Sequence, residues 1–193
     1  MQVDEAYAAL NIVQDFVPAG NSNRPGTRLI ASSITIHNTD NDAKGANAAA
    51  HARYMKGADA QKRQVSWHYT VDDKFVYQSI PTNEIAWHSG TKQGNTSSIG
   101  IEICMNSDLD VPRAYDRAAL LVAVLAKRLK IDIDSGGLFQ HHDWSGKNCP
   151  RILREKPNGW KNFVAEVLKK EASLKPVPTI ELSFAADDHH THA

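Results

Sequence analysis

A histidine and a cysteine stand eight residues apart in the segment 141–149, which reads HHDWSGKNC. A Trp-Ser-Gly-Lys turn lies between them, so the imidazole of His141 and the thiolate of Cys149 could meet at one cation. Mixed nitrogen and sulfur ligation suits zinc, which deprotonates a thiol that binds it. Without a metal, His141 would be an ordinary surface or core residue and Cys149 a small apolar one.

Two protein ligands are too few for a zinc site. His37 lies at the end of an expected buried strand and is the natural third donor. Three protein ligands leave the fourth tetrahedral position for water, which is typical of catalytic rather than structural zinc sites. On this interpretation His37, His141 and Cys149 form a catalytic zinc site.

Two further residues could assist an attack by water on a carbonyl group. Glu102 stands between Ile101 and Ile103, where a buried carboxylate would need a partner or a function, and it could act as a base. Lys147 precedes Cys149 by two residues and could stabilise an oxyanion. The alternatives stay open: Glu102 could face solvent from its strand, and Lys147 could be a solvated loop lysine.

Strands that alternate with helices must position these side chains. The patterns predict strands over 29–37, 65–71, 75–80, 98–104 and 138–141, and helices over 46–55, 113–129 and 158–170. This order predicts the α/β class, with a single mixed β-sheet and helices packed on it. Isoleucines alternate with His37 in one strand and with Glu102 in another. If these strands are neighbours in register, the face that carries His37 and Glu102 is a site rather than a core.

Composition excludes several classes of protein. The 193 residues include 22 Lys+Arg and 22 Asp+Glu, and this zero net charge argues against a nucleic-acid partner and against a polybasic membrane-surface protein. The longest apolar runs are too short to span a bilayer. The first residues show no secretory signal, so we expect synthesis in the cytoplasm and free thiols at Cys104 and Cys149, although these two could pair.

Five motifs occur in order along the chain: SITIHNT (33–39), SWHYTVDD (66–73), AWHSG (86–90), SIGIEIC (98–104) and the 141–150 loop. Taken together, they resemble the zinc-dependent N-acetylmuramoyl-L-alanine amidases of the type-2 amidase family. This family includes phage and prophage endolysins and is related to the peptidoglycan recognition proteins. The resemblance covers roughly residues 10–170 and is strongest to prophage amidases of Bacillus-type bacteria.

The resemblance implies a peptidoglycan-recognition-protein-like amidase fold that hydrolyses the bond between N-acetylmuramic acid and L-alanine. It puts the zinc ligands on His37, His141 and Cys149, the acidic catalytic residue on Glu102 and a subgroup lysine on Lys147. His142 directly follows His141 and could compete for the metal, but adjacent residues point in different directions.

The resemblance also implies contacts with peptidoglycan or a muropeptide through Trp67, His68, Trp87 and His88. The tryptophans could instead pack in the core, and His68 could be structural. We expect an N-terminal arm over 1–27, the catalytic domain over 28–172 and a flexible tail over 173–193. A monomer is favoured, released to the cell wall by phage lysis machinery. The alternatives are a non-catalytic peptidoglycan-binding module and a zinc peptidase acting on the stem peptide.

Overall fold

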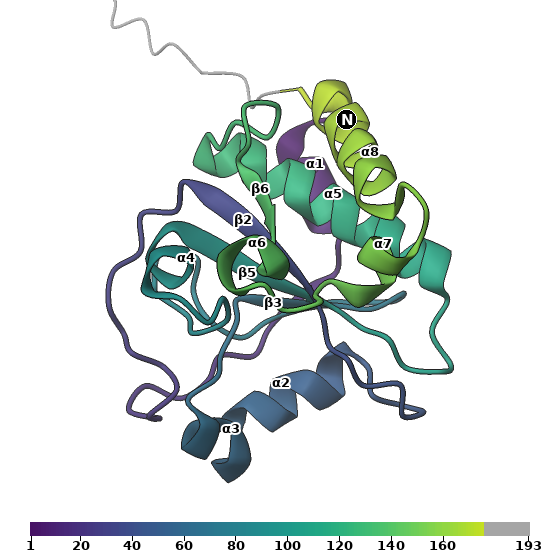
Figure 1. The fold of residues 1–193 in the computed structure, drawn as a ribbon. Coiled ribbons are helices and arrows are strands. Elements are labelled where there is room, and N and C mark those ends of the chain that lie inside the picture. The colour runs from purple at the N-terminus through teal and green to yellow at the C-terminus, as the bar shows by residue number, and fades with distance from the viewer. Residues whose placement is uncertain (176–193) are drawn as a thin grey trace, which may run out of the picture.

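Six strands form one mixed sheet in the computed structural model, which describes residues 1–175 (Figure 1). They are β1 (Ile12–Gln14), β2 (Ser33–Asn38), β3 (Tyr69–Val71), β4 (Val76–Gln78), β5 (Ser98–Ile103) and β6 (Leu138–Gln140). Their order across the sheet is β1-β4-β3-β5-β2-β6. The β3–β4 pair is antiparallel, and the other neighbouring pairs are parallel. The predicted single mixed sheet is therefore confirmed.

Helices cover both faces of this sheet, as Figure 1 shows. On one face lie α1 (Val3–Ala9), α5 (Val111–Leu129) and α8 (Gly159–Ser173), and on the other α2 (Ala48–Lys56) and α3 (Ala58–Arg63). The shorter helices are α4 (Lys92–Ser97), α6 (His141–Ser145) and α7 (Arg151–Glu155). Within residues 1–175, no helix has both the length and the apolar character needed to cross a membrane.

The two central strands, β2 and β5, pair in parallel along their whole length. Ile34 lies opposite Ile99 and Ile36 opposite Ile101, and all four are fully buried in the main hydrophobic core. Burying each such side chain contributes roughly 1.5–3 kcal/mol. The isoleucine face therefore anchors the sheet to its helix layer and leaves the opposite face for polar side chains.

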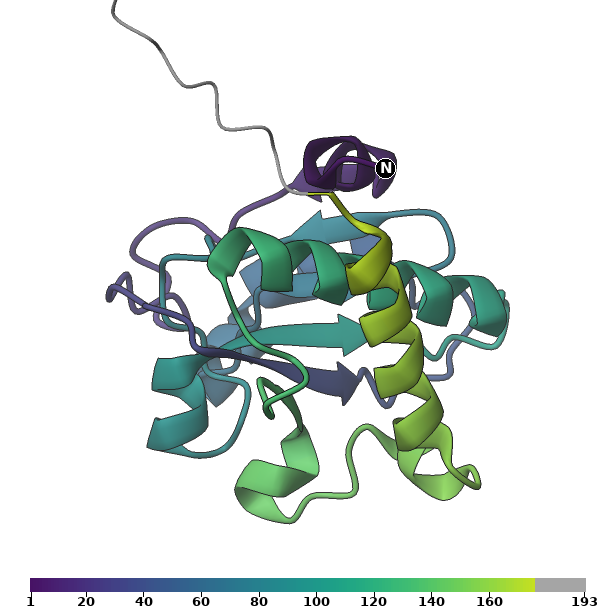
Figure 2. The ribbon, with the colours of Figure 1, turned by 90° about the horizontal axis from the view of Figure 1, so that it is seen from above.

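Helix α5 covers the isoleucine face, and local signals set both of its ends. The carboxylate of Asp110 caps the helix by accepting a hydrogen bond from the Arg113 amide at 3.2 Å. The helix ends at Leu129, and the next residue, Lys130, caps it with a left-handed φ of 57°. Helix α8 crosses α5 (Figure 2) and contributes Phe163 and Val167 to the same core. Both helices were predicted from their apolar spacing.

The first residues of the chain form a helix and a strand that the sequence patterns did not predict. Helix α1 buries Val3 and Ala6, and Leu10 follows it into the core with no exposed surface. Strand β1 then pairs in parallel with β4 at the sheet edge. With seven and three residues, α1 and β1 are too short to show a clear period.

Several strands begin a few residues away from their predicted first residue. The strands predicted from 29 and 65 begin only at Ser33 and Tyr69. Helix α4, which directly precedes β5, was not among the predicted helices. The boundaries 1–27, 28–172 and 173–193 stay a prediction, and the expected flexible tail lies, from residue 176 onward, outside the described residues.

We predict that Leu10→Ala destabilises the protein by about 2–5 kcal/mol, because it leaves a cavity in the core below α1. Val13→Ala is the matched control, since Val13 is 36% exposed on β1 and should cost under about 1 kcal/mol. Urea unfolding of both variants measures the difference. Equal, small losses would mean that the N-terminal residues do not belong to the folded core.

Candidate metal centre and the groove beside it

The register of the central strands brings a histidine and a carboxyl group together. His37 of β2 pairs with Glu102 of β5, on the face opposite the isoleucines. The His37 Nδ1 lies 3.9 Å from the Glu102 Oε1, and both side chains are largely buried. The expected neighbouring strands and the predicted shared face are therefore both present.

A tight loop brings two more candidate ligands to His37. His141 is the first residue of α6, directly after β6, and Gly146 ends this helix with a φ of 75° that turns the chain back. The His142 amide then donates to the Cys149 carbonyl at 2.9 Å, and the Asn38 amide of β2 donates to the Cys149 Sγ at 3.4 Å. The thiol is thereby held beside the end of β2.

Three ligand atoms converge at this point. The His37 Nδ1 lies 3.0 Å from the His141 Nδ1 and 3.9 Å from the Cys149 Sγ, and the three atoms all lie within 4.8 Å of one another. His142 turns away, and its Nδ1 contacts the Lys147 carbonyl at 3.2 Å. In the described part of the chain, these three side chains form a group that could hold a metal ion.

Burial keeps the two imidazoles of this group neutral. It lowers the pKa of His37 well below its usual value and that of His141 to about 4, with Lys147 lowering both further. Burial, together with the charge of Glu102, raises the pKa of the Cys149 thiol to about 12. A metal cation would reverse this shift, because it stabilises the thiolate that binds it.

The carboxyl group of Glu102 is largely buried, with 14% of the side chain exposed, and one of its oxygens, Oε2, makes no hydrogen bond to the described residues. Burial raises the pKa of Glu102 to about 8, against the opposing charge of Lys147. A group with such a pKa can accept and release a proton near neutral pH.

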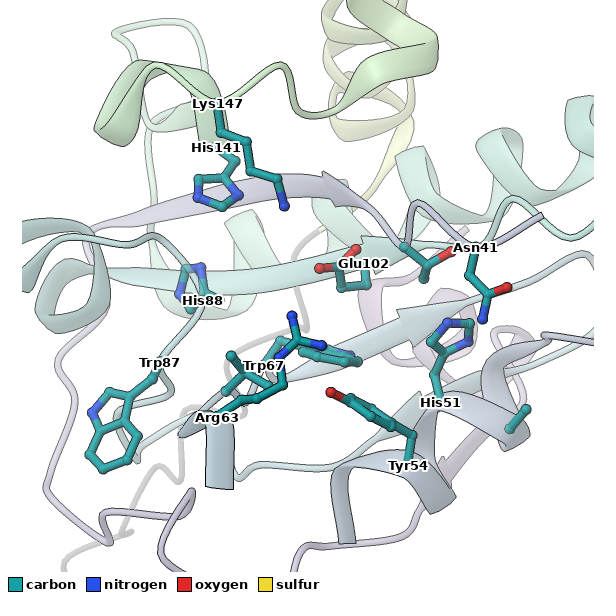
Figure 3. A pocket seen from close by; sticks show the side chains of 13 residues that line it. Asn41, His51, Tyr54, Arg63, Trp67, Trp87, His88, Glu102, His141 and Lys147 are labelled. Atoms are coloured by element: carbon teal, nitrogen blue, oxygen red, sulfur yellow. The ribbon is translucent and has the colours of Figure 1, made fainter. Parts of the chain in front are cut away.

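A cavity of about 410 Å³ opens beside the cluster (Figure 3). Glu102 and His141 line it together with Lys147, whose side chain points toward Glu102 in Figure 3. The α2–α3 side contributes Tyr54 and Arg63. Lys147 and Arg63 give this groove two cationic side chains, so it suits a substrate that carries carboxylates.

The predicted substrate contacts occupy two different environments. Trp67 and Trp87 line the groove, and Trp67 also packs in a small core below α2. His88 lies at the groove and contacts His37. His68 is fully buried, is absent from the groove lining, and bonds through both ring nitrogens to backbone groups of Gly100 and Glu84.

The sequence patterns did not indicate several residues that line the groove. Tyr54 and Arg63 come from the alanine-rich helix α2 and from α3, and Asn41 comes from the loop after β2. Tyr54 stacks on Trp67 with ring centroids 6.4 Å apart. No motif in the sequence links the α2–α3 segment to the site, so only the packing of these helices reveals its contribution.

Comparisons with known proteins agree with this geometry. Residues 27–152 match the family model described as N-acetylmuramoyl-L-alanine amidase. The Bacillus subtilis amidase XlyA is 46% identical over 160 residues, which are 82% of this chain and 51% of XlyA. CwlH from the same organism is 42% identical over 176 residues, which are 88% of this chain and 68% of CwlH. The chain thus spans about half the length of XlyA.

Solved structures show a similarity to the same group of proteins. The catalytic domain of XlyA superposes with a TM-score of 0.75 at 45% identity, covering 81% of this chain and 99% of that domain. PlyL superposes with a TM-score of 0.69 at 32% identity, covering 82% of this chain and 96% of PlyL. The similarity therefore extends over most of the described sheet-and-helix domain and is not confined to the motifs.

We predict that Glu102→Gln changes how stability depends on pH in metal-free protein. Folding raises the pKa of Glu102 from its usual 4.5 to about 8, so the folded state binds the proton more tightly than the unfolded chain does. The resulting stabilisation is complete below pH 4.5 and is lost as the pH rises through 8. Glutamine cannot ionise, so E102Q should gain stability relative to the parent over this range, by a few kcal/mol at most.

Urea unfolding in the presence of a chelator, at a series of pH values from 4.5 to 9, measures this difference. A constant difference between E102Q and the parent protein across the series would contradict the raised pKa.

Proposed function

The chain belongs to the N-acetylmuramoyl-L-alanine amidase family, and from this premise we propose that it hydrolyses the amide bond between N-acetylmuramic acid and L-alanine in bacterial peptidoglycan. The single observation that carries this proposal is the convergence of His37, His141 and Cys149 beside Glu102 at the wall of a groove. The names of the relatives XlyA and CwlH support the choice of bond.

Zinc is the metal that this donor set fits best. Two neutral imidazoles and one thiol match its preferred ligands. In a tetrahedral zinc site, bond lengths of about 2.0–2.3 Å separate two ligand nitrogens by about 3.4 Å, and a nitrogen from a sulfur by about 3.6 Å. The corresponding distances here are 3.0 Å and 3.9 Å, so His37, His141 and Cys149 could hold the ion after only small adjustments. The chemistry that zinc supplies when bound is Lewis acidity toward the scissile carbonyl and the attacking water.

Glu102 is the proposed general base and acid. Its Oε2 is unbonded within the described chain, and the carboxyl group lines the groove beside the three proposed ligands, where it can accept and release a proton. The carboxylate takes a proton from the water that attacks the lactyl carbonyl. It then delivers this proton to the departing amine of L-alanine, so that the glycan and the stem peptide separate.

Lys147 is the proposed stabiliser of the oxyanion. Its side chain reaches over the groove toward Glu102, and its charge lowers the pKa values of His37, His141 and Glu102 (Figure 3). An ammonium group in this position favours negative charge that develops on the carbonyl oxygen. Trp87, which is partly exposed, and the part of the buried Trp67 that lines the groove are the proposed contacts with the sugar or the peptide.

We further propose that the protein acts as a monomer on peptidoglycan after release by phage lysis machinery. A solved relative described as a mutant endolysin from Bacillus subtilis is 46% identical and covers 82% of this chain, which supports this setting.

Identification of the digestion products tests the proposed reaction. Purified muropeptides or cell walls are incubated with the protein, and mass spectrometry should find glycan free of peptide together with intact stem peptides that begin with L-alanine. Glu102→Gln is the control and should be slower by a factor of about 10² to 10⁴, because it keeps the groove but loses the proton-transfer group. Cut stem peptides would indicate a peptidase, and binding without any product would indicate a peptidoglycan-binding module.

We predict that Cys149→Ser lowers zinc affinity strongly, because it replaces a thiolate ligand with a hydroxyl that ionises poorly. Elemental analysis after dialysis against limiting chelator measures the bound zinc. Cys104→Ser is the matched control, since Cys104 is also a free, buried thiol but does not belong to the cluster. Equal zinc contents in both variants would remove Cys149 from the metal site.

A further inference from the structure

A row of buried imidazoles continues behind the proposed metal ligand His37. Its Nε2 lies 3.0 Å from the Nδ1 of His88, and the Nε2 of His88 lies 3.3 Å from the Ser98 carbonyl oxygen. His37 is 1% exposed and His88 is 8% exposed, so water has little access to these contacts. The other ring nitrogen of His37, Nδ1, faces His141 and Cys149.

The carbonyl at the end of this row decides where the protons lie. A carbonyl oxygen can only accept, so the Nε2 of His88 carries the hydrogen of that contact. The buried ring of His88 contacts an imidazole and a carbonyl rather than a carboxylate, so it is neutral, and its Nδ1 is bare. His37 must then donate from Nε2 to this bare nitrogen, and its own Nδ1 keeps a free lone pair. The opposite arrangement would set two acceptors, the His88 Nε2 and the Ser98 oxygen, against each other.

We propose that His88 is a positioning residue: it fixes the tautomer and the ring orientation of His37, so that the lone pair of Nδ1 faces His141 and Cys149. This inference rests on the proposed metal site and gives the AWHSG motif a role in addition to lining the groove. Ligating histidines commonly need such a partner on their second nitrogen. Here the partner is another histidine, and the backbone of Ser98 sets its direction.

Hydrogen bonds from a single side chain fix the backbone of the loop that carries His88. The Asn95 Oδ1 accepts hydrogen bonds from the backbone amides of His88 and Ser89 at 3.0 and 2.9 Å. The same loop lies against His141, because a Cβ added at Gly90 would lie 3.7 Å from the His141 Nε2. One loop therefore supports both imidazoles of the cluster.

The sheet leaves a space that the His88 ring fills. A Cβ added at Gly100 of β5 would meet the ring of His88 at 2.6 Å, so a residue with a side chain at position 100 would displace it. His68 does not compete as a partner for His37, because its Nδ1 accepts from the Gly100 amide at 2.9 Å and its Nε2 contacts the Glu84 carbonyl at 2.9 Å.

The protonation pattern can be tested without any substitution. Nitrogen-15 NMR of the histidine rings in metal-free parent protein distinguishes a protonated from a bare ring nitrogen. We expect the hydrogen on Nε2 in both His37 and His88. A hydrogen on the Nδ1 of His88 would overturn the proposal.

Two substitutions at His88 test the consequence for the metal. His88→Leu removes the acceptor and should lower zinc affinity about 10- to 100-fold, with the His37 proton shifting in part to Nδ1 in the metal-free variant. His88→Asn places an amide oxygen near the former Nδ1 and should retain most of the affinity. Competition with a chelator measures zinc affinity in both.

The control is Asn23→Ala, which removes two hydrogen bonds from a buried side chain to the carbonyls of Met55 and Val65, away from the cluster. It should lower the melting temperature and leave zinc affinity unchanged. A folded H88L with the affinity of the parent protein, or an equal loss in H88L and N23A, would overturn the proposal. So would a rise in KM for muropeptide in H88L with zinc affinity intact, because His88 would then serve only as a substrate contact.

If H88L does not fold, the comparison of His88→Asn with His88→Gln takes its place. Glutamine puts its amide near the former Nε2 and leaves His37 without its acceptor, so H88Q should lose affinity where H88N keeps it. Equal affinities in this pair would contradict the role of His88. Failure of the parent protein to bind zinc would instead refute the proposed function, and the NMR measurement would still report on His88.

Discussion

The parallel pairing of β2 with β5 is the constraint on which the rest of the site depends. Each strand alternates between isoleucines and polar residues, and the register sets His37 directly opposite Glu102. A slip of one residue would turn one strand over and bring a polar side chain into the core. The burial of Ile34, Ile36, Ile99 and Ile101 against the α5 layer therefore also holds the proton-transfer group beside the proposed ligand. Packing on one face determines chemistry on the other.

Burial makes the ionisation of acidic groups at the site cost free energy, and a bound metal cation would offset this cost. Glu102 has a raised pKa and an unbonded oxygen, and Cys149 is a buried thiol with a raised pKa. Each of these groups resists ionisation in the isolated chain. A cation at the cluster stabilises both negative charges at once, so metal binding and the ionisation of Cys149 and Glu102 are coupled.

Much of this arrangement could be predicted from the sequence because its signals are local. The alternation around His37 and Glu102 predicted two strands, and the spacing of apolar residues predicted α5 and α8. The structure differs from the prediction where contacts between segments distant in the sequence determine the local structure or the lining of the groove. Helix α1 and strand β1 are stabilised by tertiary packing, and Tyr54 and Arg63 reach the groove only because α2 and α3 pack beside it. The partnership of His88 with His37 joins residues 51 positions apart, and no local pattern indicates it.

Hydrogen bonds join the two ends of the described chain, and this closeness makes the domain suitable for circular permutation. The Lys175 amide donates to the Met1 carbonyl at 3.1 Å, and the Val3 amide donates to the Lys175 carbonyl at 3.1 Å. Both ends lie on the α1–α8 side of the sheet, whereas α2 and α3 border the groove on the other side (Figure 1). A short linker could therefore join residue 175 to residue 1 and give a circular permutant, with its new ends opened in an exposed loop such as the one around Gly136. Such a rearrangement would leave the β2–β5 register and the ligand cluster intact, since neither depends on where the chain starts.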